Sequence, residues 1–318
     1  MDGVIVVDKP SGWTSHDVVA KVKRTLKAKK VGHLGTLDPA ATGVLPLVVD
    51  GATKFARFLD VGGKGYAAVM KLGEETDTQD AEGEVLKTSE VGSIERAEIE
   101  DTLGSFVGTI EQTPPMYSSV KQGGVPLYKL ARKGVTVERA AKEVDIYSIA
   151  VSRVELPFVD FSVECSRGTY IRTLSVDAGA KLGAGAHLYR LRRTRSGTFT
   201  EAEAVDVQGS KEELEAALIP LEAALVRSSA LIKGIELDDS AASKVARGPF
   251  RAETSESFKP GEVVRLMHGV VVLAFAEYVS TGEPSGSSEF NVVKVLYGGA
   301  VRSSNEGSAV KSGRASGA

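Results

Sequence analysis

Residues 32–47, GHLGTLDPAATGVLPL, place one aspartate and one histidine in a run of glycine, proline and apolar residues. A free aspartate titrates near ~3.9, so Asp38 is charged at neutral pH and would need positioning more than activation to do chemistry. The alternative is a plain turn, because an aspartate before proline commonly bonds its own backbone. A phosphate loop is excluded, since no Gly-Lys-Ser/Thr follows and the glycines lack the G-x-G-x-x-G spacing. The residues alone leave the turn and the positioned acid both open.

Metal and disulfide chemistry find little support in the sequence. Cys165 is the single cysteine, which excludes an intramolecular disulfide and a thiolate cage. The four histidines are scattered and form no H-E-x-x-H pair, so zinc chemistry is not expected. We therefore expect no metal site.

Charge is unevenly distributed along the chain, although the net charge of the 318 residues is only −3. Residues 167–195 carry seven basic side chains and one acid, whereas residues 74–101 carry eleven acids and two basic side chains. Such segregation either creates a field that attracts a polyanion or reflects solvated faces that differ in sign. No apolar run approaches the roughly 20 residues of a membrane span, and the first residues lack the features of a secretory signal. A cytoplasmic location is the expectation.

The elements that must position Asp38 can be outlined from periodicity. Short apolar or alternating runs predict strands at residues 4–7, 45–49, 66–72, 85–86, 144–156 and 159–165. Helical spacing predicts helices from a cap at Thr14 or Ser15 to Leu26, over 94–106 and over 170–182. Two prolines and two glycines predict irregular structure over 112–128. Because no steady βαβ rhythm is present, we predict an α+β fold with a mixed, largely antiparallel sheet and flanking helices.

A second, smaller domain is predicted after a change of texture near residues 220–229. A short helical piece at 238–247 and strands at 263–267, 270–278 and 292–297 indicate a small β-rich domain. The Gly/Ser/Ala-rich end has almost nothing to bury and is predicted to be disordered. The predicted domains are 1–228, 229–298 and a tail at 299–318.

Six cations crowd the end of the first helix and the residues after it. They are Lys21, Lys23, Arg24, Lys27, Lys29 and Lys30. They form either a solvated face or part of a phosphate-binding surface.

Several segments, in order, resemble the pseudouridine synthases of the TruB type, the tRNA pseudouridine-55 synthases. The resemblance covers about 230 residues. It rests on VDKPSGWTSHDVV, GHLGTLDPAATGVLP, KGYAAVMKLGEETDTQDAEG, QTPPMYSSVKQGGVPLYKLARKG, CSRGTYIRTLSVDAG and GAHLYRLRRTRSG. It implies the pseudouridine synthase fold, with a PUA-like RNA-binding domain at the C-terminus.

The same resemblance implies three catalytic residues. Asp38 is the expected carboxylate, which would attack or stabilise the sugar at C1′. Arg172 is its expected partner, because a guanidinium fork fixes a carboxylate better than a lysine does. Tyr66 is expected to stack on the target uracil and to take the proton from C5.

Substrate-binding residues are implied in the same way. Tyr170 and Leu191 are expected as walls of the base pocket, and His33 as the group that occupies the space left by the extruded nucleotide. Lys9 is expected to support the pocket rather than react. Arg193, in the cluster 190–195, is expected to contact RNA phosphates.

The implied substrate is the T-loop of tRNA, with uridine-55 as target. The base must leave its stack, which costs a few kcal/mol and is cheapest in a loop. No metal, nucleotide or redox cofactor is needed. We expect a monomer with no obligate protein partner and no membrane association.

Three alternatives remain open from the sequence. A guide-RNA-dependent pseudouridine synthase subunit would share the catalytic residues. A non-catalytic tRNA-binding or tRNA-folding protein would share only the RNA-binding surface. Glycoside hydrolysis would need a second carboxylate facing Asp38, which the tyrosine and arginine motifs do not supply.

Overall fold

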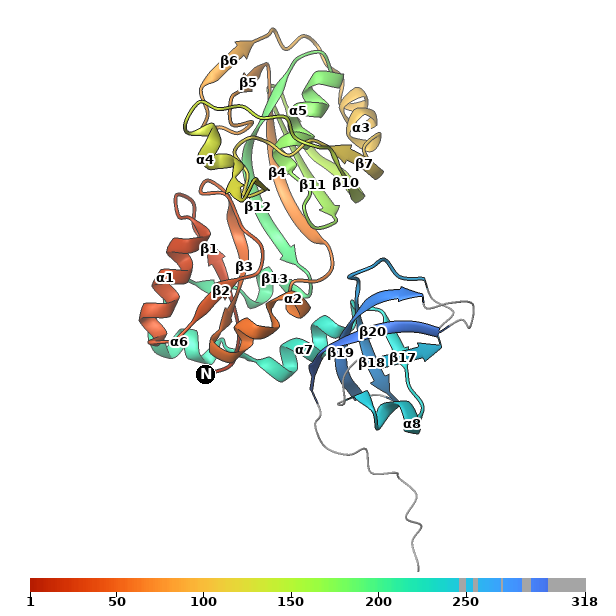
Figure 1. Ribbon diagram of the computed structural model, residues 1–318. Coiled ribbons are helices and arrows are strands. Elements are labelled where there is room, and N and C mark those ends of the chain that lie inside the picture. Colours follow the sequence, from red (N-terminus) through yellow and green to blue (C-terminus); the bar gives the residue numbers. More distant parts are fainter. Residues whose placement is uncertain (246–249, 254–256, 270, 282–286, 297–318) are drawn as a thin grey trace, which may run out of the picture. The chain divides into compact units, whose positions relative to one another are not determined.

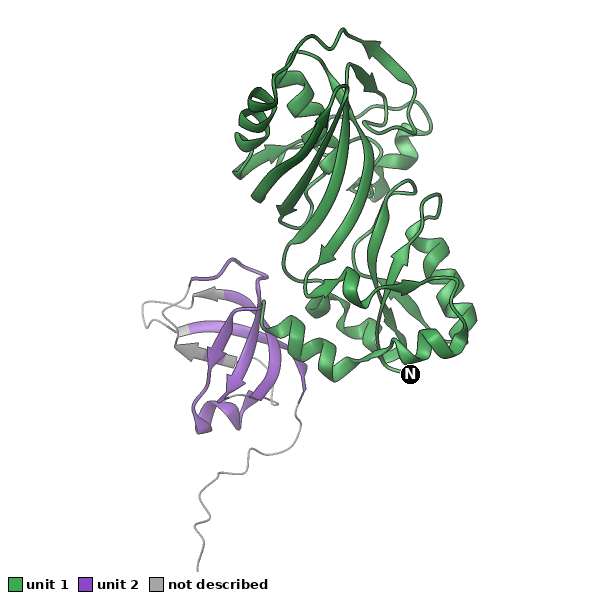
Figure 2. Ribbon diagram, turned by 180° about the vertical axis from the view of Figure 1, so that it is seen from behind, with its two compact units in different colours: residues 1–231 green, residues 232–318 purple. Residues whose placement is uncertain are grey.

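The computed structural model describes residues 1–245, 250–253, 257–269, 271–281 and 287–296 (Figure 1). These residues form two compact units, one of residues 1–231 and one that begins at residue 232 (Figure 2). The predicted tail at 299–318 lies outside the described residues.

The first unit is built on an eleven-stranded sheet whose main path has the order β14-β1-β3-β12-β4-β11-β10-β7. Its strands are β1 (Gly3–Lys9), β2 (Val31–His33), β3 (Thr42–Val49), β4 (Lys64–Leu72), β7 (Gly108–Gln112), β10 (Lys142–Glu155), β11 (Phe158–Cys165), β12 (Ala186–Ser196), β13 (Phe199–Thr200), β14 (Val205–Asp206) and β15 (Ile219–Pro220). The β1–β14 and β3–β12 pairs are parallel, and the others are antiparallel. The prediction of a mixed, largely antiparallel sheet is therefore confirmed.

Helices flank this sheet, as expected. They are α1 (Ser15–Leu26), α2 (Ala56–Leu59), α3 (Arg96–Gly104), α4 (Leu127–Ala131), α5 (Ile171–Lys181), α6 (Lys211–Ala216) and α7 (Leu221–Ser229), with short 3₁₀ turns at Asp50–Phe55 and Glu201–Glu203. Helix α1 begins at a capping box, in which the Thr14 side chain accepts from the Asp17 amide and Asp17 accepts from the Thr14 amide. Its apolar residues recur every four positions and are buried, so the opposite face points outward.

Strand β4 shows why one face of the sheet becomes the core. Tyr66 and Met70 are buried with every second residue of the strand, whereas Ala67 is exposed. Helix α5 packs its Leu174 into the same buried cluster. The alternation therefore turns Tyr66 to the side of the sheet on which α5 lies.

The segment 112–128 is more regular than predicted. It contains a two-stranded hairpin of β8 (Lys121–Gln122) and β9 (Val125–Pro126), followed by α4. The turn residues Gly123 and Gly124 have φ of 57° and 82°, a conformation that glycine adopts without a steric penalty. The expectation of irregular structure was wrong there, because the two glycines form a hairpin turn rather than an open loop. A second small hairpin, β5 (Glu74–Thr76) and β6 (Val85–Thr88), encloses the acidic turn at 77–84.

The second unit is β-rich, as predicted. Its sheet has the order β16-β18-β19-β20-β17, formed by Gly234–Glu236, Val263–His268, Val271–Thr281, Ser287–Val295 and Phe250–Glu253. Val264, Leu266, Ala274 and Phe290 are buried in its core. The helical piece α8 spans only Asp239–Ala242, which is shorter than the predicted 238–247, and residues 246–247 lie outside the described residues.

Candidate active site

Asp38 lies in a loop between β2 and β3 whose backbone is held from two elements. The Ser15 hydroxyl, at the start of α1, donates to the Leu37 carbonyl at 3.1 Å and accepts from the Leu37 amide at 2.9 Å. The ammonium group of Lys9, at the end of β1, donates to the Pro39 carbonyl at 2.9 Å. Both side chains are almost fully buried. The residues on either side of Asp38 are therefore fixed, and this preorganises its carboxylate.

Lys9 is a support of the loops rather than a surface cation. Its ammonium also donates to the carbonyls of Pro10 and Trp13, at 2.9 and 2.6 Å. Burial lowers its pKa from 10.5 to about 8. The side chain has no exposed area, which agrees with a supporting part and leaves no surface for direct contact with RNA.

Arg193 is placed differently from the prediction. A phosphate contact was expected of it, but the side chain has no exposed area. Its guanidinium donates to the carbonyls of Val44 at 2.8 Å, Gly35 at 3.1 Å and Thr36 at 3.4 Å. The predicted phosphate contact is wrong in this structure, because the alternation of β12 turns Arg193 inward beneath the Asp38 loop.

The structure brings Asp38 and Arg172 together. The Arg172 Nε lies 3.0 Å from the Asp38 Oδ2. Its two terminal nitrogens donate to the Thr78 and Tyr117 carbonyls at 2.9 and 2.7 Å, and Nη1 lies 3.7 Å from the Asp80 carboxylate. Only 5% of the Arg172 side chain is exposed, against 40% of Asp38. A rigid cation thus holds the inner edge of a carboxylate that remains accessible from outside.

The electrostatics of Asp38 combine opposing effects. Desolvation by the surrounding loop raises the pKa of the carboxyl above its usual range. Arg172 and Lys9 lower the pKa, whereas the negative charge of Asp80 raises it. The carboxylate is therefore less solvated, and more basic, than an ordinary surface aspartate.

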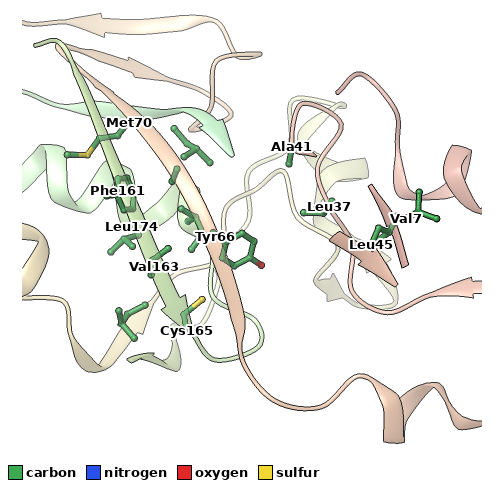
Figure 3. Close-up of a cluster of buried hydrophobic side chains, with 14 of the residues drawn as sticks. Val7, Leu37, Ala41, Leu45, Tyr66, Met70, Phe161, Val163, Cys165 and Leu174 are labelled. Atoms are coloured by element: carbon green, nitrogen blue, oxygen red, sulfur yellow. The ribbon is translucent and has the colours of Figure 1, made fainter. Parts of the chain in front are cut away.

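Tyr66 lies directly opposite Arg193 in the β4–β12 pair. It belongs to the same buried cluster as Leu37 and Ala41, and its ring points from β4 toward the side where these two residues lie (Figure 3). Burial raises the pKa of its phenol to about 12, and the adjacent Arg193 guanidinium opposes the shift. The ring is 8% exposed.

Tyr170 and Leu191 also lie near these groups. Tyr170 immediately precedes α5, and its amide and carbonyl bond the Gln112 side chain at 3.0 and 3.3 Å. The Asp38 and Arg172 charges both act on the pKa of the Tyr170 phenol, which burial raises. Leu191 is half-buried against the main core and pairs with Ala68 on the Tyr66 face of the sheet.

His33 lies on β2, five residues before Asp38. Its Nδ1 is buried and has no hydrogen-bond partner among the described residues. Its ring meets that of His16 edge-on, with 5.5 Å between the centroids. Burial and the neighbouring charges of His16 and Arg193 lower its pKa, so the ring is neutral at neutral pH.

Lys9 was expected to support the pocket, but the parts that Ser15 and Asp80 take beside Asp38 and Arg172 were not predicted from the sequence. Ser15 was considered as a helix cap, but Thr14 is the cap and Ser15 bonds the loop instead. Asp80 was counted only among the eleven acids of residues 74–101, yet it lies beside Arg172. The one available signal was its place in the segment that carries Tyr66, and spacing alone could not separate it from its acidic neighbours.

Neither a metal centre nor a membrane span is found in the part of the chain that the structure describes. These residues contain no group of three or more histidine, cysteine, aspartate or glutamate side chains arranged to hold a metal ion. Among the same residues, no helix is both long and apolar enough to cross a membrane.

Comparison with known proteins gives a consistent result. Residues 23–171 match the N-terminal domain of the TruB family of pseudouridylate synthases, and residues 172–226 match the C-terminal domain of tRNA pseudouridylate synthase B. The tRNA pseudouridine synthase B of Geobacter sulfurreducens is 42% identical over 304 residues, which cover 93% of this chain and 100% of that protein. That of Geotalea uraniireducens is 46% identical over 288 residues, or 87% of this chain and 92% of that protein.

A solved structure supports the same assignment. The Cbf5-Nop10-Gar1 complex contains a chain that is 31% identical to this one and superposes with a TM-score of 0.67. The match covers 92% of this chain and 84% of that one. From the motifs, the sheet and these similarities together, the chain belongs to the TruB family of pseudouridylate synthases.

Proposed function

We propose that this chain converts uridine-55 in the T-loop of tRNA to pseudouridine. The observation that carries the proposal is the 3.0 Å contact between the guanidinium of Arg172 and a carboxylate of Asp38 that stays 40% exposed. The names of the sequence relatives, tRNA pseudouridine synthase B, support tRNA as the substrate.

The reaction breaks the N1–C1′ bond of uridine, turns the base and joins C5 to C1′. C5 then loses its proton and N1 gains one, so the product is an isomer and no oxidant or second substrate is consumed. An ionised carboxylate facing the sugar can add to C1′ or remove the C2′ proton, and both routes place the same demand on Asp38. Arg172 would orient the carboxylate and favour its charged form.

The remaining site residues would hold the flipped base. Tyr66 would stack on the uracil, because every base presents a face for stacking. Removing the C5 proton requires the phenolate of Tyr66, which Arg193 favours and burial disfavours. Tyr170 and Leu191 would form the walls of the pocket, and His33 would occupy the space that the extruded nucleotide leaves.

The test is to map pseudouridine in a tRNA transcript incubated with the purified protein and no other component. We expect one modified position, in the T-loop. Asp38→Asn should bind the transcript within severalfold of wild type and form no product. Substantial turnover by this variant would contradict the assignment of the carboxylate.

The same experiment separates the alternatives. A guide-RNA-dependent subunit would leave the bare transcript unmodified until a guide and its protein partners were added. The likeness to a Cbf5 complex is the observation that favours this second candidate. This likeness, at 31% identity, is weaker support than the 42% identity to a bacterial synthase over the full length of that protein. A purely tRNA-binding protein would bind the transcript and modify nothing. We propose action as a monomer without an obligate protein partner.

A further inference from the structure

Strand β7 ends in a buried glutamine, Gln112, although its neighbours in the chain, Glu111 and Thr113, are exposed. Only 2% of Gln112 is exposed. The order of the sheet places β7 at its edge, next to β10 (Figure 1). Burial of a primary amide is unfavourable unless its polar atoms are hydrogen-bonded, so a glutamine in this place needs good partners.

The amide of Gln112 finds both partners on one residue, Tyr170. Its Oε1 accepts from the Tyr170 backbone amide at 3.0 Å, and its Nε2 donates to the Tyr170 carbonyl at 3.3 Å. The same carbonyl accepts from the Leu174 amide at 3.1 Å, a bond of the first turn of α5. The side chain of Gln112 thus pairs with the backbone at the point where α5 begins, as a neighbouring strand would do.

The local sequence gives α5 a weak beginning. Tyr170 is the N-cap residue, and its side chain makes no capping hydrogen bond. The first turn contains no acidic residue, and it carries the cation of Arg172 at the end of the helix where the dipole disfavours positive charge. The start of the helix, and with it the position of Arg172, therefore depends on contacts from elsewhere in the fold.

The segment that follows Gln112 bonds Arg172 itself. The Tyr117 carbonyl accepts from Nη2 of the Arg172 guanidinium at 2.7 Å. Between the two bonded positions stand Pro114 and Pro115, which are buried and whose rings fix the backbone angle φ. This short and stiff connection therefore holds both the backbone before Arg172 and the end of its side chain.

The other partner of the central contact is held in a comparable way. The Ser15 hydroxyl donates to and accepts from the backbone of Leu37, which immediately precedes Asp38. Asp38 and Arg172 thus each lie within two residues of a backbone position that a buried polar side chain holds with two bonds. The two holding side chains come from different elements, α1 and β7. The 3.0 Å contact between the Arg172 Nε and the Asp38 Oδ2 requires both to be in place.

We propose that Gln112 is a positioning residue for the isomerisation, which sets the start of α5 so that the Arg172 guanidinium meets the Asp38 carboxylate. The inference rests on the proposed function, because it takes Asp38 as the group that acts on the sugar. Both polar groups of Gln112 are engaged by Tyr170, so Gln112 acts through the backbone and not on the substrate. A displacement of about 1 Å can lower a rate about 10²-fold, which makes the effect of a positioning residue measurable.

The test replaces Gln112 by methionine, which has a similar length but offers no donor and only a weak acceptor. The matched control is Glu111→Met, which puts the same side chain at the exposed neighbouring position of β7. For Gln112→Met we expect the single-turnover rate on a tRNA transcript to fall about 10- to 10²-fold, with the Kd for the transcript within about threefold of wild type. Glu111→Met should keep both values within about twofold of wild type.

The combination of Gln112→Met with Arg172→Ala separates positioning from a general loss of stability. In the Arg172→Ala background, Gln112→Met should lower the rate by less than about twofold further, because the group that it positions is absent. A loss by the same factor in both backgrounds, a loss confined to Kd, or a wild-type rate in Gln112→Met would overturn the proposal. Should Gln112→Met fail to fold, Gln112→Asn decides by the same outcomes, since it keeps a buried amide that is one methylene too short to bond both Tyr170 groups.

The pKa of the Asp38 carboxyl, followed by carbon-13 NMR, tests the positioning without reference to activity. Arg172 lowers this pKa, and Lys9 and Asp80 act on it from positions that the substitution leaves in place. Gln112→Met should therefore raise the pKa, and the control variant should leave it unchanged. If wild type forms no pseudouridine, the proposed function fails, and a raised pKa in Gln112→Met would still support the positioning. An unchanged pKa in Gln112→Met would refute it.

Discussion

Strand β12 and helix α1 are both rich in cations, and the structure uses them in opposite ways. Arg193 of β12 has no exposed area and donates to three carbonyls, two of them in the loop that carries Asp38. Arg24 of α1 is exposed and forms no ion pair with any described carboxylate. The strand alternates its side chains across a sheet with a buried face, whereas the helix keeps its apolar residues on one face and its cations outside. The two segments are similar in composition but differ in role: the cations of β12 hold the site, and those of α1 face solvent.

Arg172 gives the first test of the buried arginines. Its replacement by alanine leaves Asp38 and Asp80 without their shared cation and removes the support from the Thr78 and Tyr117 carbonyls. We expect kcat/KM to fall about 10²- to 10³-fold, the usual cost of removing one preorganised electrostatic contact. Single-turnover kinetics and binding at several salt concentrations give the measurement.

This loss should be in turnover, with little change in the salt slope of RNA binding, because the Arg172 side chain is only 5% exposed. Lys181→Ala, at the other end of α5, is the control and should behave like wild type. A changed salt slope in Arg172→Ala would show that this buried arginine also contacts RNA, which would contradict the division between buried arginines that hold the site and exposed arginines that face solvent.

Arg193 sharpens the comparison within a single strand. Arg193→Ala leaves three carbonyl acceptors without a donor in a buried place, at about 1–3 kcal/mol each when unsatisfied. We expect the free energy of unfolding to fall by about 3 kcal/mol or more. Arg190→Ala, three residues earlier and exposed, should change it by less than about 0.5 kcal/mol. Urea titration of both variants measures the difference, and similar values for the two would refute the inward placement of Arg193.

The pH dependence of activity tests the environment of Asp38. The shift expected here is smaller than the effects of the substitutions above. Because desolvation raises the pKa of this carboxyl, activity should begin to fall with decreasing pH above the ordinary aspartate value of about 3.9. Below that pKa the fall should be about tenfold per pH unit in single-turnover rate. In Arg172→Ala the acid limb should move to higher pH, since the cation that favours the carboxylate is gone.

The same pKa shift should change the free energy of unfolding in the direction opposite to its effect on activity, because ionised Asp38 supports activity but weakens the fold. A raised folded-state pKa means that ionised Asp38 weakens the fold, and that this cost appears as pH rises from the unfolded value through the folded one. Asp38→Asn should therefore be more stable than wild type at pH 7 and equal to it below about pH 3.9. A less stable variant at pH 7 would contradict the desolvated environment.

Much of the fold could be predicted from local pattern. The alternation of residues 66–72 predicted a strand, and the four-residue spacing of Val18, Val22 and Leu26 predicted a helix, because each period reports directly on a buried face. The hairpin at Gly123 and Gly124 was missed, because two glycines interrupt a pattern and form a tight turn with equal ease.

The candidate site was likewise predicted from the sequence only in part. The residues of segment 32–47 left open whether Asp38 is a turn residue or a positioned acid, but the motif resembled that of a family, since residue types and order are properties of the chain itself. The meeting of Asp38 with Arg172, the bond between Ser15 and Leu37, and the burial of Arg193 join residues 22 to 158 positions apart. Only tertiary structure decides such contacts, because they depend on which strands pair and which face each strand turns inward.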